Sequence, residues 1–199
     1  MKIGVCADPN AGEILRDAGF DFIEMGVSGA LKPDKPYSDF VSELDGIRNS
    51  PLPCLAVNCL LPGHMKIIGP DVNLLEIKSY LTTVCERAND AGIEKIVFGS
   101  GEARKCPDGF DRNKAFLQLV EFGKILGDEA TKYDLLIAVE PLNRSECNML
   151  NSVNGTLSIE GKWMPYGGGF AIDASVPSVK EHPEHIKKAI ATIDRRAHV

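Results

Sequence analysis

The feature that most constrains the fold is a regular alternation of short apolar runs with longer segments of helical periodicity. The apolar runs are rich in β-branched residues and lie at residues 2–7, 20–25, 54–60, 95–99, 135–140 and 156–160. Most of them are nearly continuous rather than alternately polar and apolar, which is typical of strands buried on both faces. The sequence therefore predicts a parallel sheet covered by helices.

Helices are predicted between these strands at residues 10–18, 38–48, 71–91 and 111–132, and after the last strand at 182–195. Apolar residues recur there at steps of three and four, which favours amphipathic helices. Gly19 and Gly92 follow two of these segments, as C-terminal glycines commonly do. Residues 147–153 are expected to form at most two helical turns. Gly167, Gly168 and Gly169 are expected to form a flexible loop after the last strand.

Size and charge limit the class of protein. The 199 residues suffice for a single domain, predicted to span residues 1–199. A net charge of −6 makes nucleic acid a poor partner. No apolar run is long enough to span a membrane, and the N-terminus reads as a strand rather than a leader. The six cysteines show no metal-binding spacing and are expected to be reduced. The expected location is the cytoplasm.

Two predicted strands end in the same way, with a glutamate followed by a residue that breaks the strand. Glu140 precedes Pro141, and Glu160 precedes Gly161. Because ligands bind at the C-terminal ends of parallel strands, two carboxylates there are candidates to bind a hard divalent cation or to share acid and base roles. Glu24 occupies a similar position on the second strand. The alternative is that each glutamate caps a loop amide or pairs with a basic residue.

Four segments resemble the xylose isomerase-like TIM-barrel family, which includes sugar-phosphate isomerases and ketose 3-epimerases. They read PGHMK at 62–66, VFGSGEAR at 97–104, EPLNRSECN at 140–148 and LSIEGKW at 157–163. These segments are similar to the regions following the third, fourth, fifth and eighth barrel strands. The resemblance covers nearly all of residues 1–165, and the segment at 140–148 is its most specific part.

The resemblance implies roles for three glutamates. Glu140 and Glu160 would be the first and last metal ligands and would also act as the acid/base pair on either face of a sugar. Glu146 would contact the substrate near its carbonyl end. A Mn²⁺, Mg²⁺ or Co²⁺ ion would polarise a ketose carbonyl and stabilise an enediolate. The implied activity is therefore sugar or sugar-phosphate isomerisation or epimerisation, in carbohydrate metabolism.

The chain also departs from the family pattern. The family site adds an Asp from the sixth strand and a His from the seventh, whereas here the fifth-strand segment runs directly into the eighth. We therefore predict a TIM-barrel-like α/β fold shortened to about six strands, with the missing part near residues 152–154. Such a site would bind its metal weakly or not at all. Uncovered sheet edges would favour a homo-oligomer.

Three further residues are candidate substrate contacts. His64 lies on the loop after the third strand, Arg104 follows a glycine-rich turn, and Trp163 follows the second glutamate. Their alternatives are a solvated histidine, an arginine paired with a carboxylate, and an indole that covers the rim of the barrel.

Two other functions compete with the isomerase hypothesis. One is a non-catalytic barrel remnant that self-associates or binds a ligand. The other is a metal phosphoesterase of the abasic-site endonuclease type, which the acidic composition and the small number of histidines disfavour.

Overall fold

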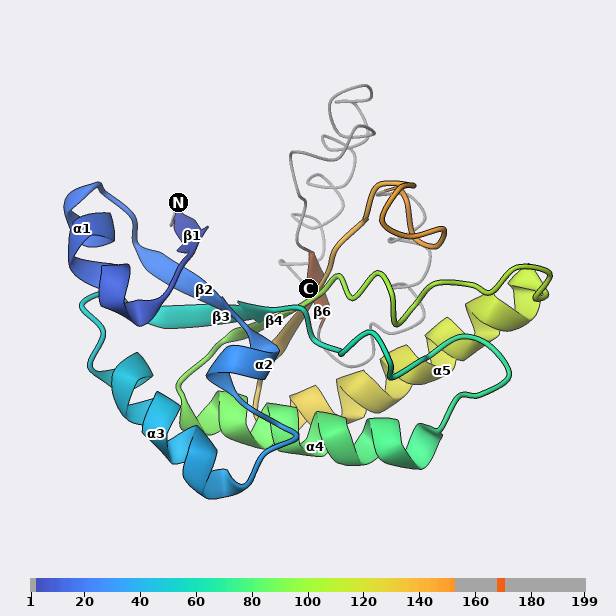
Figure 1. Cartoon of the computed structure of the whole chain (residues 1–199), viewed down its shortest axis with the longest axis horizontal. Helices are drawn as coiled ribbons and strands as arrows, with labels where there is room; N and C mark the ends of the chain where they lie inside the picture. The colour runs from blue at the N-terminus through green and yellow to red at the C-terminus, as the bar shows by residue number, and fades with distance from the viewer. Residues whose placement is uncertain (1–2, 153–167, 171–199) are drawn as a thin grey trace, which may run out of the picture.

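The computed structural model describes residues 3–152 and 168–170, which form one six-stranded sheet in the order β1-β2-β3-β4-β5-β6 (Figure 1). All neighbouring strands pair in parallel. The strands are β1 (Gly4–Cys6), β2 (Phe22–Gly26), β3 (Cys54–Asn58), β4 (Lys95–Phe98), β5 (Leu136–Val139) and β6 (Gly168–Phe170). The predicted α/β class with a parallel sheet is confirmed.

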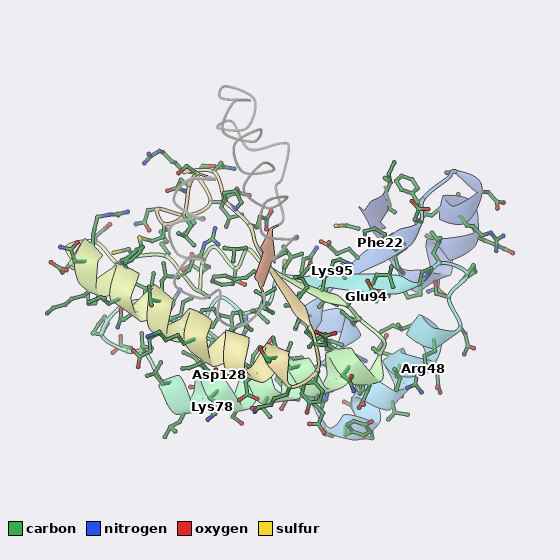
Figure 2. All side chains as sticks on the ribbon, turned by 180° about the vertical axis from the view of Figure 1, so that it is seen from behind. Phe22, Arg48, Lys78, Glu94, Lys95 and Asp128 are labelled. Carbon is green, nitrogen blue, oxygen red and sulfur yellow. The ribbon has the colours of Figure 1, made fainter. Side chains whose placement is uncertain are left out.

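The helices are η1 (Pro9–Ala11), α1 (Gly12–Asp17), α2 (Val27–Ala30), α3 (Tyr37–Arg48), α4 (Leu74–Asp90) and α5 (Arg112–Thr131). Figure 1 shows α3, α4 and α5 along one side of the sheet. Ile77, Leu81 and Val84 of α4 are buried, whereas Lys78 and Asp128 lie on the outer side of α4 and α5 (Figure 2). The apolar stripe of α4 is therefore buried as its spacing predicts.

The sheet is an arc within the described residues. There, β1 pairs only with β2 and β6 pairs only with β5, so no pairing closes a barrel. The predicted strand at 156–160 and helix at 182–195 lie outside the described residues. That residues 1–199 form one domain, internally shortened near 152–154, stays a prediction for the same reason.

One local expectation was wrong. Gly168 and Gly169 belong to β6, paired with Ile137 and Ala138 of β5, and are not part of a loop. A ladder uses main-chain groups, so glycine weakens a strand without forbidding it. Residues 147–152, the described part of the segment expected to form at most two helical turns, contain no helix. The side chain of Asn151 bonds the main chain of this segment instead. Asn151 Nδ2 donates to Leu142 O at 2.9 Å and to Cys147 O at 2.7 Å.

The long loops after β3 and β4 are held together and form one rim of the sheet. Ile67 N donates to Ala103 O at 3.0 Å, and Gly69 exchanges two hydrogen bonds with the side chain of Gln118 on α5. Ile67 and Ile68 are buried below this rim. The side chains that follow β3 and β4 are thereby fixed relative to each other. No helix in the described part of the chain is long and apolar enough to cross a membrane.

Candidate functional site

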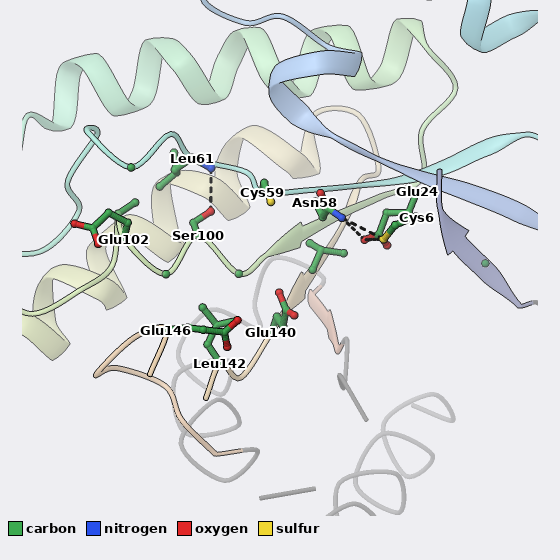
Figure 3. A pocket seen from close by; sticks show the side chains of 16 residues that line it. Cys6, Glu24, Asn58, Cys59, Leu61, Ser100, Glu102, Glu140, Leu142 and Glu146 are labelled. Carbon is green, nitrogen blue, oxygen red and sulfur yellow. Dashed lines mark hydrogen bonds between the residues drawn. The ribbon is translucent and has the colours of Figure 1, made fainter. Parts of the chain in front are cut away.

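A cavity of about 890 Å³ lies at the C-terminal ends of the strands (Figure 3). Its walls come from the ends of β1 to β4 and from the segments that follow β3, β4 and β5. The polar side chains that line it are Cys6, Glu24, Asn58, Cys59, Ser100, Glu102, Glu140 and Glu146. This is the edge at which parallel α/β folds bind ligands.

Glu140 enters the cavity directly after β5. Its main-chain N donates to Phe98 O at 3.1 Å, which continues the β4–β5 ladder and fixes the start of its side chain. Its carboxylate packs against Gly99 so closely that a Cβ added at Gly99 would lie 2.3 Å from Glu140 Oε2. Any side chain at this position would therefore displace the carboxylate of Glu140 from the place it occupies.

Glu146 reaches the same cavity from the loop after β5. Its carboxylate accepts a hydrogen bond from Asn143 N at 3.2 Å and another from Asn143 Nδ2. Asn143 Oδ1 in turn accepts from Ser145 N at 2.8 Å. This local turn, built from the most specific of the four segments, places Glu146 and Glu140 at one opening.

A second polar cluster occupies the other end of the cavity. Asn58 Nδ2 donates to Glu24 Oε1 at 2.7 Å and lies 3.5 Å from the Cys6 sulfur. Cys6 Sγ also contacts Glu24 Oε1 at 3.5 Å. Figure 3 shows the three side chains meeting above β1, β2 and β3. Asn58 was not among the predicted site residues, although a polar residue ending an apolar run is the same signal that singled out Glu140.

The thiols in the cavity remain protonated to higher pH than usual. Partial burial raises the pKa of Cys59, and the charges of Glu140 and Glu24 raise it further. The pKa of Cys6 is raised by burial and then by the charge of Glu24 and its hydrogen bond. Both shifts have the direction that a low dielectric and a negative surrounding impose on an acid.

Arg104 lies beneath the cavity rather than among its lining residues. Its side chain is fully buried. Its terminal nitrogens donate to Glu140 O at 2.8 Å and to Phe98 O at 3.2 Å, and the guanidinium lies 5.3 Å from the centre of the Phe98 ring. Burial lowers its pKa from the ordinary value. A substrate contact by Arg104 would require the side chain to leave this position.

The other predicted site residues, His64, Glu160 and Trp163, are not among the described residues that line this cavity. His64 lines a separate hollow of about 310 Å³ beside Asp34 and Tyr80. Its role in substrate binding stays a prediction. Glu160 and Trp163 lie outside the described residues, so their predicted roles are untested.

The described residues do not assemble a metal centre by themselves. They contain no group of three or more His, Cys, Asp or Glu side chains arranged to hold an ion. Glu140 supplies the oxygen ligand that a hard divalent cation prefers, but the ligand set would have to be completed from elsewhere.

The fold has counterparts among solved structures. A D-psicose 3-epimerase crystallised with D-fructose superposes with a TM-score of 0.71 at 15% identity, covering 87% of this chain and 64% of that one. A 3-keto-D-glucoside 4-epimerase from E. coli gives 0.71 at 16%, covering 91% and 71%. A sugar phosphate isomerase/epimerase from Parabacteroides distasonis gives 0.62 at 12%, covering 92% and 71%.

These likenesses show that the described residues have the parallel βα-barrel fold of such proteins, in an arc that does not close. The chain spans less than two thirds of the length of the first of them. No protein-family model and no curated protein matches the chain.

Proposed function

We propose that the protein is a sugar isomerase or epimerase whose reaction site is the cavity at the strand ends. The observation that carries the proposal is the placement of Glu140. Its carboxylate directly follows β5, enters the cavity against Gly99 and faces the same space as Glu146. Solved structures with this fold include epimerases of two sugar types, which supports the assignment.

In the proposed reaction Glu140 removes the proton from the carbon beside a sugar carbonyl. Glu160 returns a proton on the opposite face of the resulting enediolate. Such a step needs a base within hydrogen-bond reach of the reacting carbon and a site that stabilises the developing oxyanion. Glu146 accepts a hydrogen bond from a substrate hydroxyl near the carbonyl, because an ionised carboxylate is an acceptor only.

A divalent ion, Mn²⁺, Mg²⁺ or Co²⁺, belongs to the same proposal. Glu140 and Glu160 would bind it, and when bound it would supply a Lewis acid for the oxyanion. With two protein carboxylates as ligands we expect weak affinity. We further propose a cytoplasmic protein that binds a small sugar molecule and neither nucleic acid nor membrane.

The test is calorimetric titration of the full chain with Mn²⁺. We expect saturable binding that Glu140→Gln weakens at least about tenfold, because the amide removes the charge and keeps the shape. Glu121→Gln, an exposed change on α5, should leave binding unchanged. Equal Mn²⁺ binding by the Glu140→Gln variant would refute the role of Glu140 as a ligand.

A further inference from the structure

The chemistry of the cavity lining restricts which sugars it accepts. The acidic side chains in it are those of Glu24, Glu102, Glu140 and Glu146. The lining residues that the structure describes include no lysine, arginine or histidine. Phosphate and carboxylate groups are bound in proteins by arginine, lysine or exposed main-chain N–H groups. Such donors must therefore be sought among the nearby groups.

Two cations near the lining, Lys66 and Arg104, already have partners among the described residues. Lys66 Nζ donates to the carboxylate oxygen Oε1 of Glu102 at 2.7 Å and to the main-chain carbonyl of Glu102 at 2.9 Å. This pair offsets one of the four carboxylates. Arg104 is buried and directs both terminal nitrogens at main-chain oxygens. Arg104 Nε has no hydrogen-bond partner among the described residues, but it is buried and Arg104 does not line the cavity. Lys66 and Lys105 act on Glu102 through their charges, and neither lines the cavity.

The glycine-rich turn after β4 is a weak sequence signal for a phosphate loop, and side chains occupy the space over both of its glycines. The space over Gly99 holds the carboxylate of Glu140. The space over Gly101 is taken by Leu142, whose Cδ1 would lie 2.9 Å from an added Cβ. Ser100 Oγ accepts a hydrogen bond from Leu61 N at 2.9 Å. A phosphate in this turn would meet a carboxylate rather than a cradle of donors.

The hydrogen-bond donors to two of the carboxylates are uncharged amide and main-chain N–H groups, so these bonds do not neutralise the negative charge that faces the cavity. Glu24 is bonded by the amide of Asn58, and Glu146 by the main chain and amide of Asn143. The raised pKa values of Cys6 and Cys59 have the sign that this charge imposes. Hydroxyl groups, in contrast, can donate to carboxylates without a charge penalty.

We infer that the cavity selects uncharged polyhydroxy substrates and rejects phosphorylated or carboxylated ones. That the cavity binds a substrate rests on the proposed function. That it rejects anions rests only on the charges of the lining residues. It narrows the proposed function from sugars and sugar phosphates to unphosphorylated sugars.

The charge of the cavity can be measured on its own thiols. Cys59 is exposed in the lining, whereas Cys54, Cys85, Cys106 and Cys147 are buried. The full chain is treated with uncharged methyl methanethiosulfonate and with the anionic sulfonatoethyl and cationic trimethylammonioethyl reagents, and labelling of Cys59 is followed by peptide mass spectrometry. The labelling rate of Cys59 with each reagent is divided by the rate of N-acetylcysteinamide with the same reagent. Comparing these normalised rates between reagents removes the effect of the raised thiol pKa, which slows all three equally.

We expect the anionic reagent to be at least about tenfold slower than the cationic one at low salt, as local potentials of this kind impose. The difference should shrink in 1 M NaCl and in Glu24→Gln, but not in Glu121→Gln on the outer helix. Equal normalised rates, or a difference that neither salt nor Glu24→Gln reduces, would overturn the inference.

A second arm uses substrates. The full chain with Mn²⁺ is incubated in D₂O with a ketohexose or its 6-phosphate, and deuterium incorporation is read by NMR. We expect exchange with the unphosphorylated sugar only. Faster exchange of the phosphate would overturn the inference. Exchange of neither would refute the proposed isomerase function, and the thiol rates would still decide the charge selection.

Discussion

Arg104 illustrates how a residue can serve a site without touching a ligand. Its hydrogen bonds join the main-chain oxygens of Phe98 at the end of β4 and Glu140 after β5. The strand ends that present Gly99 and Glu140 are thus held from below by one buried cation. The two terminal nitrogens face carbonyls and the guanidinium lies against an aromatic ring, which offsets part of the cost of burying the charge, although Nε has no hydrogen-bond partner in the described part of the chain.

Replacing this arginine should cost stability. Arg104→Met keeps much of the volume but removes the donor to Glu140 O, so we expect a loss of about 2–3 kcal/mol in the free energy of unfolding. Urea denaturation followed by circular dichroism measures it. Arg112→Met is the matched control, because Arg112 also donates to a carbonyl, Asn148 O at 2.8 Å, but is exposed. Equal losses in both variants would contradict the argument.

At the residue scale the sequence supports some inferences and not others. The position of Glu140 is predictable, because a carboxylate that follows an apolar strand and precedes Pro141 must lie at the C-terminal end of that strand. Arg104 is not, because nothing in a glycine-rich turn tells whether the side chain points outward or folds under the strands. Arg87 is a second case, since it is buried and donates to carbonyls of Leu31 and Lys32, more than fifty residues away.

The elements follow the sequence pattern closely where side chains decide it. The expected helix at 111–132 is α5, and Asp111 caps it by accepting from Lys114 N at 2.8 Å. The expected strand at 95–99 is β4, Lys95–Phe98. β6 could not be predicted from the sequence pattern because Gly168 and Gly169 have no side chains. α2 could not be predicted because four residues are too few to show a helical periodicity.

The cap of α5 yields a prediction at the scale of the element. Asp111→Ala leaves the Lys114 N–H without its acceptor, so we expect a loss of about 1 kcal/mol in unfolding free energy. Asp111→Asn retains an acceptor oxygen and should lose much less. Thermal denaturation at neutral pH compares the three proteins. Equal losses in the asparagine and alanine variants would show that charge rather than capping stabilises this helix end, because both substitutions remove the charge.

At the scale of the molecule, the described strands form an arc with two outer members. β1 is bonded on one side by β2, and Ile3, just before it, is half exposed at 51%. An edge that no other described strand pairs, next to an apolar side chain, is a surface on which another strand can pair.

We therefore expect the full chain to self-associate through the β1 edge. Light scattering coupled to size exclusion should give a mass above the 21.6 kDa of one chain. Ile3→Lys places a solvated charge at that edge and should shift the protein towards one chain per particle. Ile14→Lys is the control, since Ile14 is 77% exposed on α1 and makes the same chemical change away from the strand edge. A single-chain mass for the unmodified protein at every concentration would refute self-association, and equal dissociation by both variants would place the interface elsewhere.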